Sequence, residues 1–121
     1  MVEFNHEWIN EYVQAWASAW NTQDTNKIVD FYDDEVVMTS PKIRECLKDT
    51  SNGILYKKKD LLKFFDLIFD EIPEFKIEVL AVAIGIKDFT IHYRGANEFL
   101  YADRIELKKD NMKISRSTVY Y

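Results

Sequence analysis

The sequence predicts a single α+β domain in which helices come first and an antiparallel sheet follows. Apolar residues recur about every 3.6 positions before Pro73 and at every second position after it. Helices followed by a run of strands with short connections are typical of α+β proteins. The length of 121 residues suits one domain over residues 1–121, and no linker or internal repeat divides it.

The composition excludes several classes of protein. With 47% apolar and 31% charged residues and only 3 Gly and 2 Pro, the chain is neither collagen-like nor disordered. The net charge is -5, and the longest basic run, residues 57–59, is followed by Asp60, so we expect no nucleic-acid partner. No apolar stretch approaches the roughly 20 residues that span a bilayer, so no membrane partner is expected.

Two features predict a cytoplasmic location. Residues 1–7 carry acids where a secretory signal needs Lys or Arg before an apolar core. Cys46 is the single cysteine and cannot form an internal disulfide, which is typical of a reducing compartment.

The first predicted element is a long helix over residues 7–20. Its polar residues follow one narrow stripe at steps of three and four, as a 3.6-residue period requires. They are Glu7, Glu11, Gln14, Ser18 and Asn21. Nearly all other positions are apolar, so we expect the helix to be buried over most of its circumference.

A short second helix is predicted to begin at Asp24, whose carboxylate can accept hydrogen bonds from the first turn, and to run to Tyr32. We expect it to stop at Asp33 and Asp34, because acids are unfavourable at the negative end of a helix. A short strand over residues 36–39 then ends at Ser40-Pro41.

The next segment, residues 41–58, is mixed and polar, and we interpret it as a loop with a turn at Asn52-Gly53. Asp60 is predicted to cap a third helix with apolar residues over 61–69. Pro73 prevents this helix from continuing, so the helical half of the chain ends near that residue.

Four strands are predicted after Pro73. They cover residues 75–86, 89–94, 98–107 and 112–121, with a turn at Gly95-Ala96. In the first strand, one face carries Phe75, Ile77, Val79, Ala81 and Ala83. The second half of this strand is apolar on both faces, so we expect a partner subunit to cover part of the outer surface.

The strand over residues 98–107 carries one acid in phase with its apolar side chains. Asp103 lies at every-second-residue spacing with four apolar residues and so shares their face of the strand. These residues are Phe99, Tyr101, Ile105 and Leu107. An ionised carboxylate alone in such a place is very unfavourable. Asp103 must therefore have a partner, lie near water in a cavity, or keep its proton.

Two hairpin registers give Asp103 different partners. A loop at Lys109-Asp110 places it opposite Arg116, whereas a loop at Asp110-Asn111 places it opposite Thr118. We favour the first register, because it pairs the acid with a base. The pair is then either a sealed ion pair that only fixes the register, or an acid and a cation at the floor of an accessible cavity.

Aromatic residues make up 15% of the chain and offer walls for such a cavity, although each ring could equally fill the core. His92 is out of phase with its apolar neighbours and is expected to face outward. The sequence contains no HExxH, CxxC, GxGxxG, P-loop or GxSxG motif, so no metal and no cofactor are predicted.

Short sequences along most of the chain resemble one known family. They are Ala19-Trp20-Asn21 through Asp24, residues 28–37, Ser40-Pro41, residues 61–65 and Tyr93-Arg94-Gly95. They are similar to the nuclear transport factor 2-like superfamily and, within it, to the SnoaL-like (polyketide-cyclase-like) group. The resemblance implies a cone-shaped, cystatin-like fold in which a curved antiparallel sheet wraps around the long N-terminal helix. It also implies a cavity at the wide end and homodimers that pack through the outer face of the sheet.

The resemblance implies candidate site residues as well. Relatives of ketosteroid isomerase have an acid before the Pro that ends the first strand, where this chain has Ser40, and a first-helix Tyr where it has Trp16. Their late-strand Asp, which an apolar site keeps neutral, matches Asp103. Members that resemble limonene epoxide hydrolase need Arg-x-Asp on a strand, and Arg94-Gly95-Ala96 lacks the acid.

We therefore expect a mostly apolar pocket that binds a small hydrophobic molecule, with Asp103 set against Arg116. The expected chemistry is isomerisation, cyclisation or dehydration of a small carbonyl compound, with Asp103 as general acid or base. The alternatives are a protein that binds its ligand without turnover and a dimerisation module. The expected lining residues are Trp16, Trp20, Tyr32, Ser40, Phe65, Tyr101 and Tyr120.

Overall fold

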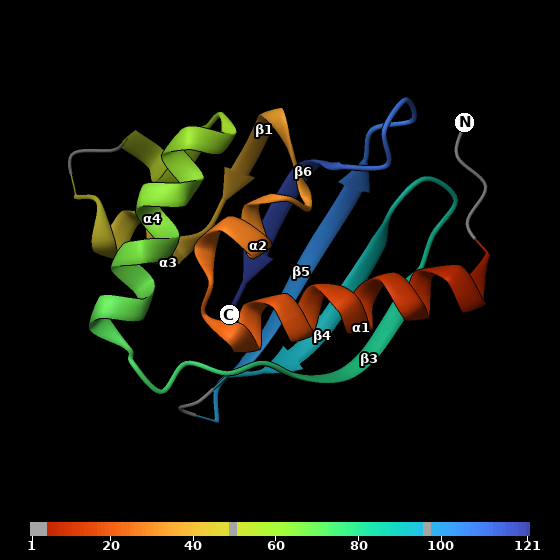
Figure 1. The fold of residues 1–121 in the computed structure, drawn as a ribbon, viewed down its shortest axis with the longest axis horizontal. Coiled ribbons are helices and arrows are strands. Elements are labelled where there is room, and N and C mark those ends of the chain that lie inside the picture. The colour runs from red at the N-terminus through yellow and green to blue at the C-terminus, as the bar shows by residue number, and fades with distance from the viewer. Residues whose placement is uncertain (1–4, 49–50, 96–97) are drawn as a thin grey trace.

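The computed structural model describes residues 5–48, 51–95 and 98–121, which form an α+β domain (Figure 1). In chain order, its elements are α1 (His6–Thr22), α2 (Thr25–Val29), β1 (Tyr32–Thr39), α3 (Pro41–Cys46), the short 3-10 turn η1 (Ser51–Gly53), β2 (Ile54–Tyr56), α4 (Lys58–Glu71), β3 (Glu78–Ile84), β4 (Phe89–Arg94), β5 (Leu100–Leu107) and β6 (Ile114–Tyr120). All of the predicted helices and strands occur in the predicted order, and α3, η1 and β2 occur in addition.

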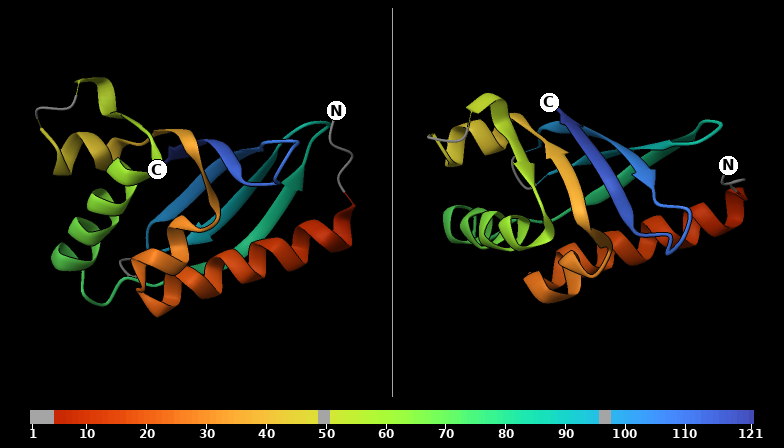
Figure 2. Two further views of the ribbon diagram at one scale, coloured as in Figure 1. Left: turned by 45° about the horizontal axis from the view of Figure 1, so that its top comes forward. Right: turned by 90° about the horizontal axis from the view of Figure 1, so that it is seen from above.

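The strands form a six-stranded sheet in the order β2-β1-β6-β5-β4-β3. The neighbours pair antiparallel except for β1 and β6, which run parallel. Figure 2 shows this sheet curving over α1, while α3, β2 and α4 gather at one end of it. The predicted curved sheet wrapped around a long N-terminal helix is therefore confirmed.

Helix α1 agrees with its predicted span. The Asn5 side chain accepts hydrogen bonds from the backbone N–H groups of Glu7 and Trp8, and the C-cap residue Gln23, directly after the helix, has a left-handed conformation. Its buried residues are Ile9, Val13, Trp16, Ala17 and Trp20. They form a narrower face than predicted, because the sheet and α2 cover only part of the helix surface and leave Trp8 exposed.

Helix α2 begins as predicted, with the Asp24 carboxylate accepting from two backbone N–H groups of the first turn. The prediction that it runs to Tyr32 is wrong, since the helix ends at Val29. Tyr32, Asp33 and Asp34 belong to β1 instead. Pairing between Tyr32 and Ile114 of β6 extends this strand, and Asn111 and the backbone N–H of Glu35 satisfy the Asp33 carboxylate.

The interpretation of residues 41–58 as a loop is wrong, because this segment contains α3 and β2. Both elements are too short to show a hydrophobic period. Pro41 occupies the first turn of α3, and the Ser40 hydroxyl accepts from the backbone N–H of Lys42. The predicted turn is present: Gly53 has a φ of +69°, and a Cβ at this position would lie 2.9 Å from the Ser40 carbonyl oxygen.

Helix α4 begins at Lys58, so Asp60 lies in its first turn and is not the cap. An acid there still complements the positive end of the helix dipole. The helix ends at Glu71, before Pro73, as predicted.

A bulge between Val79 and Ala81 changes the faces of β3. After it, Val82 pairs with Ile91 on the inner side, whereas Ala81 and Ala83 pair with outward residues of β4. Their predicted place on the face of Phe75 is therefore wrong, since one extra residue reverses the alternation.

Strand β4 keeps its predicted phase, and His92 is exposed. Ala96 of the predicted turn and residues 1–4 of the acidic start lie outside the described residues. No helix in residues 5–48, 51–95 and 98–121 is long and apolar enough to cross a membrane.

Candidate functional site

Asp103 points to the inner side of β5, between Tyr101 and Ile105, and only 2% of it is exposed. Its Oδ1 atom accepts a hydrogen bond of 2.7 Å from the Ser117 hydroxyl of β6. Among the described side chains, no cation forms an ion pair with this carboxyl group. The in-phase acid is therefore held by one neutral hydrogen bond in apolar surroundings.

The predicted pairing of Asp103 with Arg116 is wrong, and so is the alternative with Thr118. Asp103 lies opposite Val119, because Leu107 pairs with Ile114 in place of Met112 and a bulge after Glu106 shifts the register by one further residue. The Arg116 side chain is 60% exposed and contacts Glu106 on the outer side, with 3.6 Å between Nε and Oε2. An extra residue in β6 therefore brings Ser117 to the core and turns Arg116 out.

Burial controls the acidity of Asp103. Loss of water around the carboxylate raises the pKa of Asp103 from 3.8 to about 7, and the hydrogen bond from Ser117 partly offsets this rise. Asp103 in turn raises the pKa values of the nearby Tyr32 and Tyr93 phenols, whose own burial is the larger cause. Near neutral pH, both protonation states of Asp103 are thus populated while the tyrosines stay neutral.

A cavity with about 50 Å³ of free space lies beside Asp103. Five of the predicted lining residues, Trp16, Trp20, Ser40, Phe65 and Tyr101, border it together with Asp103. The other residues of its wall are Met38, Lys42, Phe64, Ile68, Ile72, Phe75, Ile77, Tyr93, Val119 and Tyr121.

Two predicted lining residues do not border this cavity. Tyr32 is buried behind the wall, where its hydroxyl accepts a hydrogen bond of 3.4 Å from Trp16 Nε1. Tyr120 faces outward and is 54% exposed. Sequence reasoning missed Tyr93, although it shares the buried phase of Phe89 and Ile91, and it missed Lys42 because α3 was interpreted as a loop.

Half of the residues that border the cavity are aromatic. Trp20 packs on Phe65 with 4.7 Å between ring centroids, and Tyr93 stacks on Tyr101 at 5.1 Å. The Trp20 Nε1 donor is buried and has no hydrogen-bond partner among the described residues. The wall therefore combines large π surfaces with few polar groups. Asp103 is one of these polar groups and is almost completely buried.

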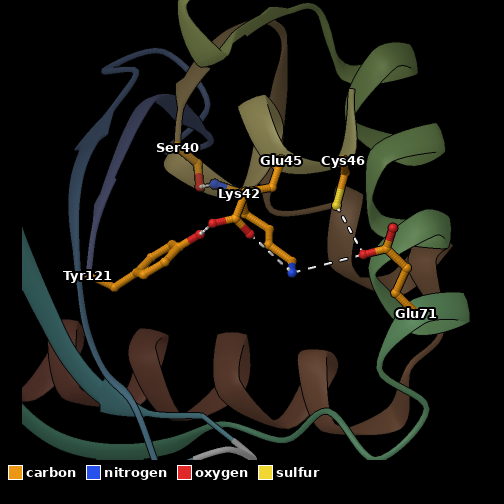
Figure 3. A network of polar contacts seen from close by, with 6 residues as sticks. All are labelled: Ser40, Lys42, Glu45, Cys46, Glu71 and Tyr121. Atoms are coloured by element: carbon orange, nitrogen blue, oxygen red, sulfur yellow. Dashed lines mark hydrogen bonds and ion pairs between the residues drawn. The ribbon is translucent and has the colours of Figure 1, made fainter. Parts of the chain in front are cut away.

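A polar network lies at the α3 side of the cavity (Figure 3). Lys42 Nζ lies 3.5 Å from Glu45 Oε2 and 3.9 Å from Glu71 Oε2. Tyr121 donates to Glu45 Oε1 at 2.9 Å, and the Cys46 thiol donates to Glu71 at 3.3 Å. Burial and the Glu71 carboxylate raise the pKa of Cys46 to about 11, so this thiol is a poor nucleophile at neutral pH.

The described part of the chain has no cluster of three or more His, Cys, Asp or Glu side chains that could hold a metal ion. Asp103 borders the cavity, and its hydrogen-bond partner Ser117 is fully buried beside it.

Replacing Ser117 with alanine is expected to raise the pKa of Asp103 above about 7, because the hydroxyl stabilises the ionised carboxyl group. Arg116→Ala is the matched control on the same strand and should leave that pKa unchanged, since Arg116 faces outward. Carboxyl ¹³C NMR titrations of the two variants measure the difference. A shift in Arg116→Ala alone would contradict the observed strand register.

A curved sheet that wraps around a long helix and encloses a cavity is the architecture of nuclear transport factor 2-like proteins. The family model described as the SnoaL-like domain matches residues 13–110, and the chain therefore belongs to this family. The resemblance inferred from the sequence is confirmed. None of the curated proteins compared with the chain matches it.

Solved structures share the fold along most of the chain. A SnoaL-like protein of unknown function from Burkholderia thailandensis is 24% identical, with a TM-score of 0.88 over 98% of both chains. A candidate polyketide cyclase from Sinorhizobium meliloti is 10% identical, with a TM-score of 0.73 over 91% of this chain and 94% of that one. A protein of ketosteroid isomerase-like fold from Catenulispora acidiphila is 15% identical, with a TM-score of 0.71 over 90% and 83% of the two chains.

Proposed function

We propose that this protein binds a compact, mostly apolar molecule in the cavity and that Asp103 acts on it as a general acid or base. The observation that carries the proposal is a carboxyl group with a pKa of about 7 on the wall of an apolar cavity. A group whose pKa lies near the working pH is best suited to take up and release a proton.

The reaction that we propose is proton transfer at a carbon next to a carbonyl group, because a single carboxyl group can both take and return such a proton. The ionised carboxylate would take a proton from that carbon, and the resulting acid would return a proton to the same or another position. Apolar walls keep bulk water away and so strengthen electrostatic interactions at the reacting atoms. Ser117 would hold the carboxyl group in place throughout.

The size of the cavity favours a small substrate. Its 50 Å³ of free space corresponds to roughly three or four water molecules, so a larger molecule would require wall side chains to move. The Catenulispora protein of similar fold was crystallised in complex with trimethylamine, which is also a compact molecule. This likeness supports a ligand of a few non-hydrogen atoms.

Hydrogen–deuterium exchange of butanone in D₂O tests the proposal. We expect the protein to accelerate exchange of the protons next to the carbonyl group, with a rate that rises through about pH 7 as Asp103 ionises. Asp103→Asn should remove the acceleration, and Arg116→Ala should retain it. Exchange no faster than in buffer, or equal rates in all three proteins, would refute the acid–base role. If butanone perturbed the cavity resonances without exchange, binding without turnover would be the better description.

We propose that a second copy of this chain covers the outer face of the sheet. The observation that favours it is a set of exposed apolar side chains there, including Leu80, Leu100 and Tyr120. Sedimentation velocity should give a dimer for the wild-type protein and a monomer for Leu100→Glu. A monomeric wild-type protein would refute this arrangement.

A further inference from the structure

We propose that the cavity selects a compact organic cation, such as a small quaternary or protonated amine, over a neutral molecule of the same size. This inference rests on the proposed function, because it names the class of ligand that the same cavity would bind. It follows from the partners of Asp103, the rings of the wall, the charges at the α3 side and the available space.

Asp103 lacks a cationic partner within the described residues. Its one hydrogen bond comes from the neutral Ser117 hydroxyl. Arg116, the base that the sequence offered as a partner, lies on the other face of the sheet with Glu106. A buried carboxylate is stabilised most by a positive charge in contact with it, so a ligand cation would complete a pair that the chain leaves open.

The wall suits a cation through its aromatic rings. Trp16, Trp20, Tyr93 and Tyr101 all border the cavity. The faces of such rings carry negative electrostatic potential, and desolvated cations within about 6 Å of a ring are attracted to it. A neutral apolar ligand would also contact these rings but would gain nothing from this attraction.

The charges at the α3 side also favour a cation. Lys42 borders the cavity and would repel one, but its ammonium group lies within 4 Å of both Glu45 and Glu71. These three groups together carry one net negative charge, and the whole chain carries a net charge of -5. The field of the protein therefore attracts cations towards this side of the cavity.

The space limits the size of the cation. About 50 Å³ corresponds to roughly three or four water molecules, so a cation of four or five non-hydrogen atoms fills the cavity and requires wall side chains to move outward. Tetramethylammonium has this size and does not titrate. The neutral tert-butanol has the same number of non-hydrogen atoms and can donate a hydrogen bond to a carboxyl group.

The affinity for tetramethylammonium should increase as Asp103 ionises. Among the described residues, the phenols of Tyr32 on β1 and Tyr93 on β4 interact with this carboxyl group, and burial holds the pKa values of both far above neutral pH. Tyr101 on β5 and Tyr121 after β6 border the same cavity, and burial also raises the pKa of Tyr121. Lys42 on α3 borders the same cavity and has Glu45 and Glu71 beside it. A change in cation affinity centred near pH 7 thus reports Asp103.

The test is a pair of NMR titrations at pH 8 that follow the indole N–H resonances of Trp16 and Trp20. We expect tetramethylammonium to bind at least about tenfold more tightly than tert-butanol, and its affinity to fall between pH 8 and pH 6. Asp103→Asn should abolish the difference between the two probes, whereas Arg116→Ala should preserve it. The pH dependence in the wild-type protein keeps the test valid if Asp103→Asn fails to fold.

The outcomes separate this inference from the proposed function. If tert-butanol binds as tightly as tetramethylammonium, or if the cation affinity is the same at pH 6 and pH 8, the cation preference is refuted and a small-molecule cavity remains. If neither probe perturbs the two indole groups, the cavity does not bind compact molecules, and the proposed function fails with the inference.

Discussion

Asp103→Asn is expected to change the free energy of unfolding in a pH-dependent way. Relative to the wild type, the variant should be more stable at pH 8 than at pH 4 by about 4 kcal/mol. The pKa of Asp103 is about 7 in the folded chain and 3.8 in its ordinary, solvated state. Between these values the folded protein keeps a proton that the unfolded chain has lost, so wild-type stability falls as the pH rises. Each pKa unit of difference between the folded and unfolded states corresponds to about 1.4 kcal/mol of stability. The asparagine side chain does not ionise, so the variant does not lose this stability as the pH rises.

Urea unfolding of both proteins at several pH values between 4 and 8 measures this difference. The Asn side chain can still accept from Ser117, and any constant cost of its buried amide cancels in the comparison across pH. Asp34→Asn, on an exposed carboxylate, controls for the change in net charge. Parallel stability curves for the wild type and Asp103→Asn would show that burial does not perturb this carboxyl group.

Phe65→Ala is expected to destabilise the protein by about 3 to 5 kcal/mol. Phe65 on α4 is fully buried, and its ring lies 4.7 Å from that of Trp20 and 5.7 Å from that of Tyr32. Removing it joins a new void to the existing cavity, and the surrounding rings are too rigid to fill that void.

The midpoint of urea unfolding should fall while its slope with denaturant stays nearly constant. Tyr56→Ala is a matched control, because it removes a ring that is 59% exposed and should cost well under 1 kcal/mol. Equal losses in the two variants would contradict the assigned packing of Phe65 between α1 and β1.

The sequence predicts most of the fold because its long elements repeat regularly. The apolar period over residues 7–20 defines α1, and the change of period at Pro73 separates helices from strands. Strand alternation alone places Asp103 on the inner side of β5, where the structure has it. The family follows from short sequences spread over the chain, and the match over residues 13–110 confirms it.

The partner of Asp103 could not be predicted, because it depends on one extra residue. Alternation assumes a regular ladder, but the register shift after Glu106 turns Arg116 outward and brings Ser117, opposite Ile105, to the inner face beside Asp103. A second bulge, after Val79, reverses the faces of β3 in the same way. Bulges depend on tertiary pairing, and local periodicity carries no signal for them.

The polar network beside the cavity also could not be predicted from the sequence. Residues Lys42 and Glu45 lie on a helix of six residues, shorter than two turns, which cannot show a hydrophobic period. Contact between α3 and α4 brings Glu71 to Lys42, and only the folded chain shows it.

The parallel pairing of β1 with β6 has a consequence for biosynthesis. Tyr32 pairs with Ile114 and Thr39 pairs with Thr118. Strand β1, which is synthesised early, therefore cannot pair with β6 until the ribosome has made the end of the chain. Until β6 emerges, β1 has only the short β2 beside it, with Val36 and Met38 on its apolar side. The nascent chain therefore exposes an unpaired strand edge with apolar side chains through most of translation. Chaperone binding during synthesis should concentrate on this segment.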